Sequence, residues 1–336
     1  MDWPRAKNIL IIAFLGVNLL LGYRLWAGPV TTAGSPYGVT AREVREVTTQ
    51  LRERGVVVAA EIPRRAQPLP LLTVKNPATG AATLIDRLLG PGAEVHSRDG
   101  VWVGVRGGEA VVVYPGGEVF YRRLPAPTGG HSVAYAAGGV PAPGGSATTP
   151  GVTVPDTSGA AVAASARAVQ VAREFWTQRG GLPSGLEPDY QVPTETGRYL
   201  VVFTCRSGGQ RFFASRAMAL VGPQGVEEAY AAWPMPDKPS GNPRPVLPAT
   251  EALLRVAPLL VEKGAAVVVE VQQGFYSPVY DAREWEAVPV WRVRLASGKV
   301  LYVNAYTGEV EGLEEPYPRQ GQEILGRPEK QGTRAR

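Results

Sequence analysis

The sequence predicts an α+β protein with a single membrane-spanning helix at its N-terminus. Two observations carry this prediction. One stretch near the start of the chain is apolar enough to cross a membrane, and the rest repeats a pattern in which an amphipathic helix precedes several short strands. No segment alternates helices with single buried strands, so the pattern does not favour a doubly wound α/β fold.

The first predicted element is a transmembrane helix at residues 8–26, after a short N-terminus at residues 1–7. Between Ile9 and Leu21 only a glycine and an asparagine interrupt the large apolar residues. The stretch is just long enough to span the hydrocarbon core of a bilayer. Tyrosine and tryptophan near its end are typical of the membrane–water interface.

A cleaved signal peptide is the competing interpretation of this stretch. The bulky leucine and tryptophan that end it do not suit a processing site, which favours an uncleaved anchor. Arg5 and Lys7 precede the helix, whereas only Arg24 closely follows it. This positive-inside bias predicts a cytoplasmic N-terminus and an extracytoplasmic ectodomain.

The ectodomain offers few residues for chemistry. Its single cysteine, Cys205, cannot form an internal disulfide and is predicted to be a small core residue within the apolar run YLVVFTC. The two histidines, His96 and His131, have no carboxylate or cysteine at metal-ligand spacing. We therefore expect no catalytic residue, no cofactor and no metal site, although acid–base work by distant carboxylates stays open.

The charge of the chain points away from nucleic acid. The net charge of +5 at pH 7 is spread thinly and favours anionic surfaces such as lipid headgroups or wall polymers. No cluster of lysines and arginines is interleaved with aromatic residues, so nucleic acid is not an expected partner.

Two proline- and glycine-rich stretches divide the ectodomain into three predicted α+β units. Residues 125–159 are predicted to form a Pro/Gly/Ala-rich linker, and residues 234–248 a stiffer Pro-rich connector. The three units cover residues 38–124, 160–233 and 249–316, and the polar residues 317–336 are predicted to be a disordered tail.

Each unit is expected to begin with a helix. In the first unit Val44, Val47 and Leu51 share one helical stripe. Thr40 is the expected N-cap and Gly55 the expected stop. The stretches SARAVQVAREFWTQRGG and ATEALLRVAPLLVEKG have the same pattern in the second and third units.

Two groups of predicted strands resemble each other. Residues 101–119 and 290–310 both begin with Val-Trp, contain a glycine turn before a valine-rich strand, and close on Gly-Glu-Val. In the second group Trp291, Val293 and Leu295 alternate with two arginines. This alternation predicts one buried face and one face that meets water.

The membrane stretch carries the most specific physical signal. Ile11, Leu15, Asn18, Gly22 and Leu25 recur at spacings of four, three, four and three, which predicts the seam of a left-handed helix pair. Asn18 can exchange hydrogen bonds with a partner helix for about 1 kcal/mol. The alternative is a bond from Asn18 to its own backbone or to a trapped water. Because a polar side chain facing lipid is costly, contact with a partner helix is the favoured interpretation.

The N-terminal sequence MDWPRAKNILIIAFLGVNLLLGYRLW resembles the start of the YycI family, with Met-Asp-Trp, a lysine before the apolar run, Phe-Leu, Asn-Leu and a closing aromatic residue. The stretch QGFYSPVYDAREWEAVPVWRVRLASGKVLYVNAYTGEVEG resembles the last unit of that family and, more loosely, PepSY-type modules. The residues between the two ends match only in general organisation.

The resemblance implies a non-catalytic regulator in the cell membrane. YycI-like proteins are single-pass accessory proteins that act with the similar protein YycH on the WalK (YycG) sensor histidine kinase. That two-component system governs cell-wall metabolism in Gram-positive bacteria. The implied contacts are between membrane helices, and pairing of the ectodomain with itself or with a YycH-like partner stays open. A PepSY-like inhibitor of an envelope protease and a wall-polymer module are the remaining alternatives.

Overall fold

The computed structural model describes Phe14, Asn18 and residues 38–76, 80–124, 159–180, 185–194, 197–261 and 266–314. These residues form a mixed α+β protein, as predicted, and most of their regular structure is sheet. None of their helices is long and apolar enough to cross a membrane. Apart from Phe14 and Asn18, the span predicted at residues 8–26 lies outside the described residues, as do most of the predicted linker and the predicted tail.

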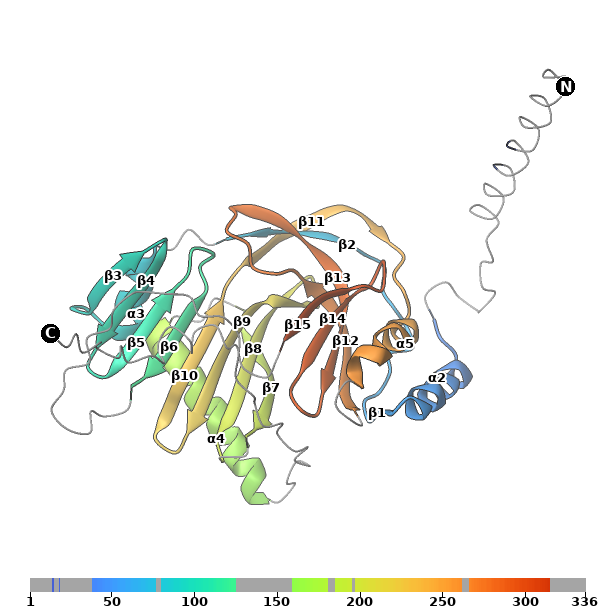
Figure 1. Cartoon of the computed structure of the whole chain (residues 1–336), viewed down its shortest axis with the longest axis horizontal. Coiled ribbons are helices and arrows are strands. Elements are labelled where there is room, and N and C mark those ends of the chain that lie inside the picture. Colours follow the sequence, from blue (N-terminus) through green and yellow to red (C-terminus); the bar gives the residue numbers. More distant parts are fainter. Residues whose placement is uncertain are drawn as a thin grey trace, which may run out of the picture.

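Three helices each lead into a four-stranded antiparallel meander (Figure 1). Helix α3 (Ala81–Leu89) precedes β3 (Glu94–Arg98), β4 (Val101–Arg106), β5 (Glu109–Val113) and β6 (Val119–Arg123). Helix α4 (Gly159–Phe175) and the π-helical turn η1 (Trp176–Gly180) precede β7 (Glu187–Pro193), β8 (Tyr199–Ser207), β9 (Gln210–Gly222) and β10 (Gly225–Ala232). Helix α5 (Ala249–Leu260) precedes β12 (Ala266–Tyr276), β13 (Glu284–Leu295), β14 (Val300–Asn304) and β15 (Val310–Glu314). We call these the first, middle and C-terminal meanders.

The meanders share the positions of their turn glycines. Gly108, Gly209 and Gly298 lie between the second and third strands. Gly117 and Gly308 lie between the third and fourth strands, and Gly225 is the first residue of the fourth strand β10; all six have positive φ. Glycine is favoured there because a side chain strains a left-handed backbone. Residues 101–119 and 290–310 therefore resemble each other because they occupy equivalent strands and turns of two meanders.

The segment 38–124, predicted as one unit, contributes to two places in the sheet. Strand β1 (Val56–Val58) pairs in parallel with β12, and β2 (Leu69–Lys75) pairs with β13, so both join the C-terminal meander. The first meander instead continues the middle one, because β6 pairs with β10. The helix that precedes the first meander is α3, which is not among the predicted helices.

Helix α2 (Ala41–Glu53) forms where the sequence predicts it. The hydroxyl of Thr40 accepts a hydrogen bond from the Glu43 N–H, and the Glu43 carboxylate accepts one from the Thr40 N–H. This reciprocal capping box satisfies two donors at the helix start. Leu51 is fully buried, and Gly55, with φ +82°, follows the helix end.

The stretch at residues 234–248 differs from the predicted connector. Its residues Met235–Arg244 form β11, which pairs with β2. The register of this pair shifts between Pro236 and Pro239 and again between Ser240 and Arg244. Proline cannot donate a hydrogen bond to a neighbouring strand. However, β11 is an edge strand, because it lies at one end of the strand order in the sheet. An edge strand tolerates proline because one side of its backbone has no strand partner.

The helices cover the sheet with two apolar cores. Helices α3 and α4 pack on the first and middle meanders, in a core that includes Ile85 and Trp176. Helices α2 and α5 pack on the C-terminal meander around Leu253 and Trp291. A smaller cluster joins Phe213 of β9 to residues of β12, β13 and β14, so the middle and C-terminal meanders also contact each other directly.

Candidate functional site

Only Asn18 of the five predicted partner-helix residues is described; Ile11, Leu15, Gly22 and Leu25 lie outside the described residues. Asn18 is helical, and its side-chain amide donates a hydrogen bond of 2.9 Å to the carbonyl oxygen of Phe14. This is the bond to its own backbone that is the predicted alternative to contact with a partner helix. An asparagine amide has a second N–H and an acceptor oxygen, so contact with a partner helix stays a prediction.

Metal-ligating side chains are scattered over the described part of the chain. No three histidine, cysteine or acidic side chains there lie close enough together to hold a metal ion. His96 is exposed on the edge strand β3, and His131 lies outside the described residues.

Cys205 on β8 is the small core residue that the sequence predicts. It is 6% exposed and packs with Phe212 and Phe275. Burial raises the pKa of its thiol to about 11. The side chain is therefore both buried and protonated at neutral pH. Because the thiolate is the reactive form of cysteine, this thiol is expected to be unreactive in the native protein.

We expect iodoacetamide to leave Cys205 unmodified in the native protein near neutral pH, and to modify it completely in guanidinium chloride. The mass of the intact protein measures both results, and Cys205 is the single cysteine of the chain. Rapid alkylation of the native protein would show that the core around β8 opens.

A buried cluster of charged side chains lies where the middle and C-terminal meanders meet. The side chain of Arg292 on β13 is 2% exposed, and its guanidinium binds both carboxylate oxygens of Asp189 on β7. It also donates to Glu270 and Gln272 of β12. The ring of Phe213 lies 4.3 Å from the guanidinium carbon of Arg292. Arg292 is thus bonded in its plane and stacked on an aromatic face.

Further ion pairs extend this cluster. Arg294 donates two hydrogen bonds, of 3.0 and 2.9 Å, to the carboxylate of Glu270. Arg216 of β9 pairs with Glu314 of β15, which is a second link between the middle and C-terminal meanders. Burial acts to raise the pKa of Asp189, but the hydrogen bonds and charge of Arg292 outweigh burial and hold that pKa below its ordinary value.

The arginine face of β13 corrects one prediction. The alternation with Trp291, Val293 and Leu295 predicts that the arginines meet water; the three apolar residues are buried as predicted, but Arg292 is 1% exposed. The prediction was wrong because the carboxylates of Asp189 and Glu270 balance the arginine charges inside the protein. This cluster holds charges in fixed positions and is suited to joining the two meanders.

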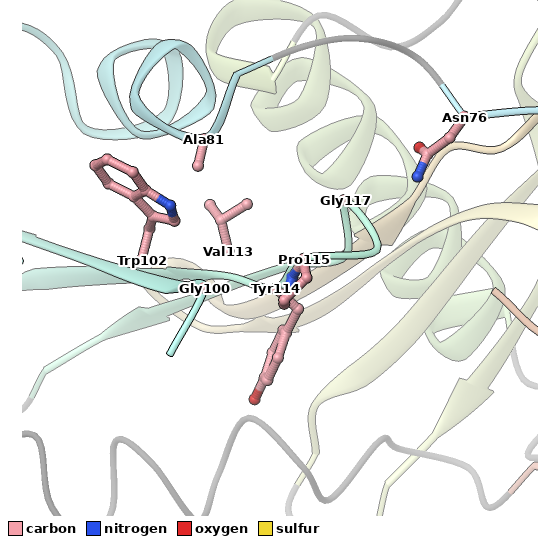
Figure 2. Close-up of a pocket in the computed structure, with 8 residues that line it drawn as sticks. All are labelled: Asn76, Ala81, Gly100, Trp102, Val113, Tyr114, Pro115 and Gly117. Carbon is pink, nitrogen blue, oxygen red and sulfur yellow. The ribbon is translucent and has the colours of Figure 1, made fainter. Parts of the chain in front are cut away.

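A pocket of about 220 Å³ lies beside the first turn of α3 (Figure 2). It is lined by Asn76, Ala81, Gly100, Trp102, Val113, Tyr114, Pro115 and Gly117. The lining residues come from the first turn of α3, from the β3–β4 turn and the start of β4, and from the end of β5 and the β5–β6 turn. Asn76 follows β2. Tyr114 lines the pocket with its backbone, because its ring points away from the other lining side chains (Figure 2).

Strand β4 determines how α3 lies over the sheet. Arg106 donates a hydrogen bond of 2.8 Å to the carbonyl oxygen of Leu89 at the end of the helix. Gly104 lies under its middle, where a Cβ atom would collide with Ile85. Trp102 is the next residue on the same face of β4, and it lies beside Ala81 at the helix start (Figure 2). The same strand thus anchors α3 and places an indole ring at the pocket.

The comparisons with known proteins identify no relative from which a function follows. No family model matches the chain, and no curated protein matches it. Among solved structures, the Bacillus megaterium YpeB C-terminal domain has 11% sequence identity and a TM-score of 0.30, covering 84% of this chain and 100% of that chain. An uncharacterized protein from Eubacterium rectale ATCC 33656 has 11% identity and a TM-score of 0.41, covering 81% and 99%. Neither likeness establishes the fold or the activity of this chain.

Proposed function

We propose that this protein is a membrane-anchored, non-catalytic accessory regulator of a WalK-type sensor histidine kinase, acting with a YycH-like partner. The observation that carries the proposal is the N-terminal sequence, which combines the YycI-like order of residues with a seam containing Asn18 and Gly22. In this proposal residues 8–26 cross the cell membrane and the ectodomain lies outside the cell.

Regulation by helix packing needs only a small energy difference. A helix that packs better against one conformation of the kinase membrane bundle shifts the population toward that conformation. A preference of about 1.4 kcal/mol changes the ratio of the two conformations tenfold. Close contact at Gly22 and one hydrogen bond from Asn18 are of this order.

The ectodomain, in this proposal, positions the membrane helix and contacts the YycH-like partner. Its three helix-plus-meander units are proposed to be PepSY-like modules. The buried ion pairs of Arg292 and Arg216 support a role as one rigid body, since each joins the middle meander to the C-terminal one. Strands β1 and β2 tie the membrane-proximal residues to the same body.

Replacing Asn18 with leucine is expected to weaken association with the kinase about fivefold, because one interhelical hydrogen bond contributes about 1 kcal/mol. A membrane two-hybrid assay with the full-length chain and the kinase measures the association. The matched control is Leu20→Ala, which lies on the opposite face of the predicted helix and should leave association unchanged. If Asn18→Leu associates as strongly as the natural sequence, the seam does not carry the contact.

A comparison of two versions of the protein distinguishes the regulator from its two alternatives, the envelope protease inhibitor and the wall-polymer module. Full-length protein and a version that begins at Pro29 are purified in detergent, and the proteins retained by each are identified. A kinase retained only by the full-length chain supports the regulator. An envelope protease retained by both versions would instead favour the PepSY-like inhibitor, and sedimentation of both with purified wall would favour a wall-polymer module.

A further inference from the structure

The tryptophan at the pocket differs from the other tryptophans that the structure describes. Trp102 is 36% exposed, whereas Trp176 and Trp291 are fully buried and Trp233 is 8% exposed. Trp285 is covered in part and donates its indole N–H to Ser277 at 2.8 Å. Trp102 is held on a paired strand, between β3 and β5, so its ring is exposed on a rigid support.

The other described lining residues combine small apolar side chains with polar groups and carry no charge. None of the eight lining residues is acidic or basic. Gly100 and Gly117 have only backbone to present, and Asn76 presents an amide whose Nδ2 donates to the Gly116 carbonyl oxygen at 3.0 Å. A ligand that fits this surface has one apolar face for the indole and hydroxyl or amide groups around its edge.

A pocket of about 220 Å³ is smaller than the roughly 300–1,000 Å³ of most small-molecule sites. It therefore suits one small ring, with the rest of a longer ligand outside. A pyranose has the required chemistry, since its C–H groups form an apolar face and its hydroxyls surround it. A charged ligand would lose its hydration without gaining a charged partner from the lining.

We propose that this pocket binds one neutral sugar ring, stacked on the indole of Trp102, with its polar groups toward Asn76 and the β5–β6 turn. The extracellular setting rests on the proposed function and makes the N-acetylhexosamine chain of the wall glycan the source of the ring. The pocket itself is independent of the membrane seam.

The test is calorimetric titration of full-length protein with the N-acetylglucosamine trimer, in a detergent whose headgroup is not a sugar. We expect saturable binding to the natural sequence and at least tenfold weaker binding after Trp102→Ala. Trp102→Phe should keep most of the affinity, because it retains an aromatic face. Leu313→Ala, which removes an exposed apolar side chain on β15 outside the pocket, should bind like the natural sequence.

A second variant keeps the test decisive if Trp102→Ala folds poorly. Ala81→Leu places a larger side chain in the pocket while leaving the indole in place, and leucine suits a helix. It is expected to block the trimer without unfolding the protein, as measured by thermal unfolding. Absence of saturable binding to the natural sequence, or unchanged binding by a folded Ala81→Leu or Trp102→Ala variant, would overturn the proposal.

The two proposals fail separately. Asn18→Leu should bind the trimer normally, because the seam and the pocket share no residue. Trimer binding without kinase association would support the sugar-binding pocket and contradict the proposed regulator. Kinase association without trimer binding would support the regulator and contradict the sugar-binding pocket.

Discussion

Replacing Asp189 with alanine is expected to destabilise the protein by about 3–5 kcal/mol, the cost of leaving a buried charge without its partner. The side chain of Arg292 is 2% exposed, and its guanidinium binds both oxygens of this carboxylate. Glu270 and Gln272 remain in contact with Arg292, but Glu270 is shared with Arg294. Urea unfolding followed by near-ultraviolet circular dichroism measures the change.

Two control variants separate the buried charge from other effects. In Asp189→Ala/Arg292→Leu both charges of the pair are removed, so the double variant should be more stable than Asp189→Ala alone. Glu46→Ala removes the carboxylate of an exposed pair with Arg42, whose side chain is 82% exposed, and should cost less than about 1 kcal/mol. Equal stability of Asp189→Ala and the natural sequence would show that the cluster does not join the meanders.

The same pair predicts how stability depends on pH. The folded-state pKa of Asp189 lies below its ordinary value, so the folded state favours the charged carboxylate. The stabilisation is therefore fully present above the unfolded-state pKa of about 3.9 and is lost as pH falls through the lower folded-state pKa. Unfolding of Asp189→Ala should show a weaker pH dependence in this acidic range than unfolding of the natural sequence.

Replacing Gly274 with alanine is expected to destabilise the protein by about 1–3 kcal/mol or more, because the site has no room for a side chain. A Cβ atom at this position would lie 2.5 Å from the carbonyl oxygen of Arg211 and 2.6 Å from the ring of Phe213. Gly274 is where β12 pairs in parallel with β9. The backbone of β9 would have to move, which opens the contact between the middle and C-terminal meanders.

Thermal unfolding of Gly274→Ala is compared with that of Gly159→Ala. Both variants add one methyl group, but a Cβ atom at Gly159 meets no atom within 4 Å. We expect Gly274→Ala to have a lower melting temperature than the natural sequence. Gly159→Ala should not lower the melting temperature. An unchanged melting temperature for Gly274→Ala would mean that β9 and β12 do not approach so closely.

Helices α2 and α3 show why some elements follow from local sequence signals and others do not. Helix α2 has a side-chain N-cap, a regular apolar stripe and a closing glycine, all of which are local signals. Helix α3 is nine residues long and begins after Gly80, which makes no side-chain capping bond. It is stabilised by Gly104 and Arg106 of β4, and those contacts cannot be deduced from the helix sequence.

Several features were determined by the sequence alone. The α+β class, the helix at α2 with its Thr40 cap, and the burial of Cys205 and Trp291 all follow from patterns within a few residues. Local periodicity determines them because it sets which side chains share a face, whatever lies opposite. The resemblance of residues 101–119 to residues 290–310 is also a local pattern. It reflects the equivalent strands and turns that the two segments form.

Only the tertiary structure decided which strands meet. Asp189 and Arg292 are 103 positions apart, and their contact turns a face predicted to meet water into a buried one. Strand β1 pairs with β12 and β2 with β13, although the first and middle meanders separate them in sequence. The pocket at Trp102 likewise needs Asn76, Ala81 and Gly117 to converge. Such contacts depend on long-range packing and on the pairing of charges in a shared interior, which no local pattern encodes.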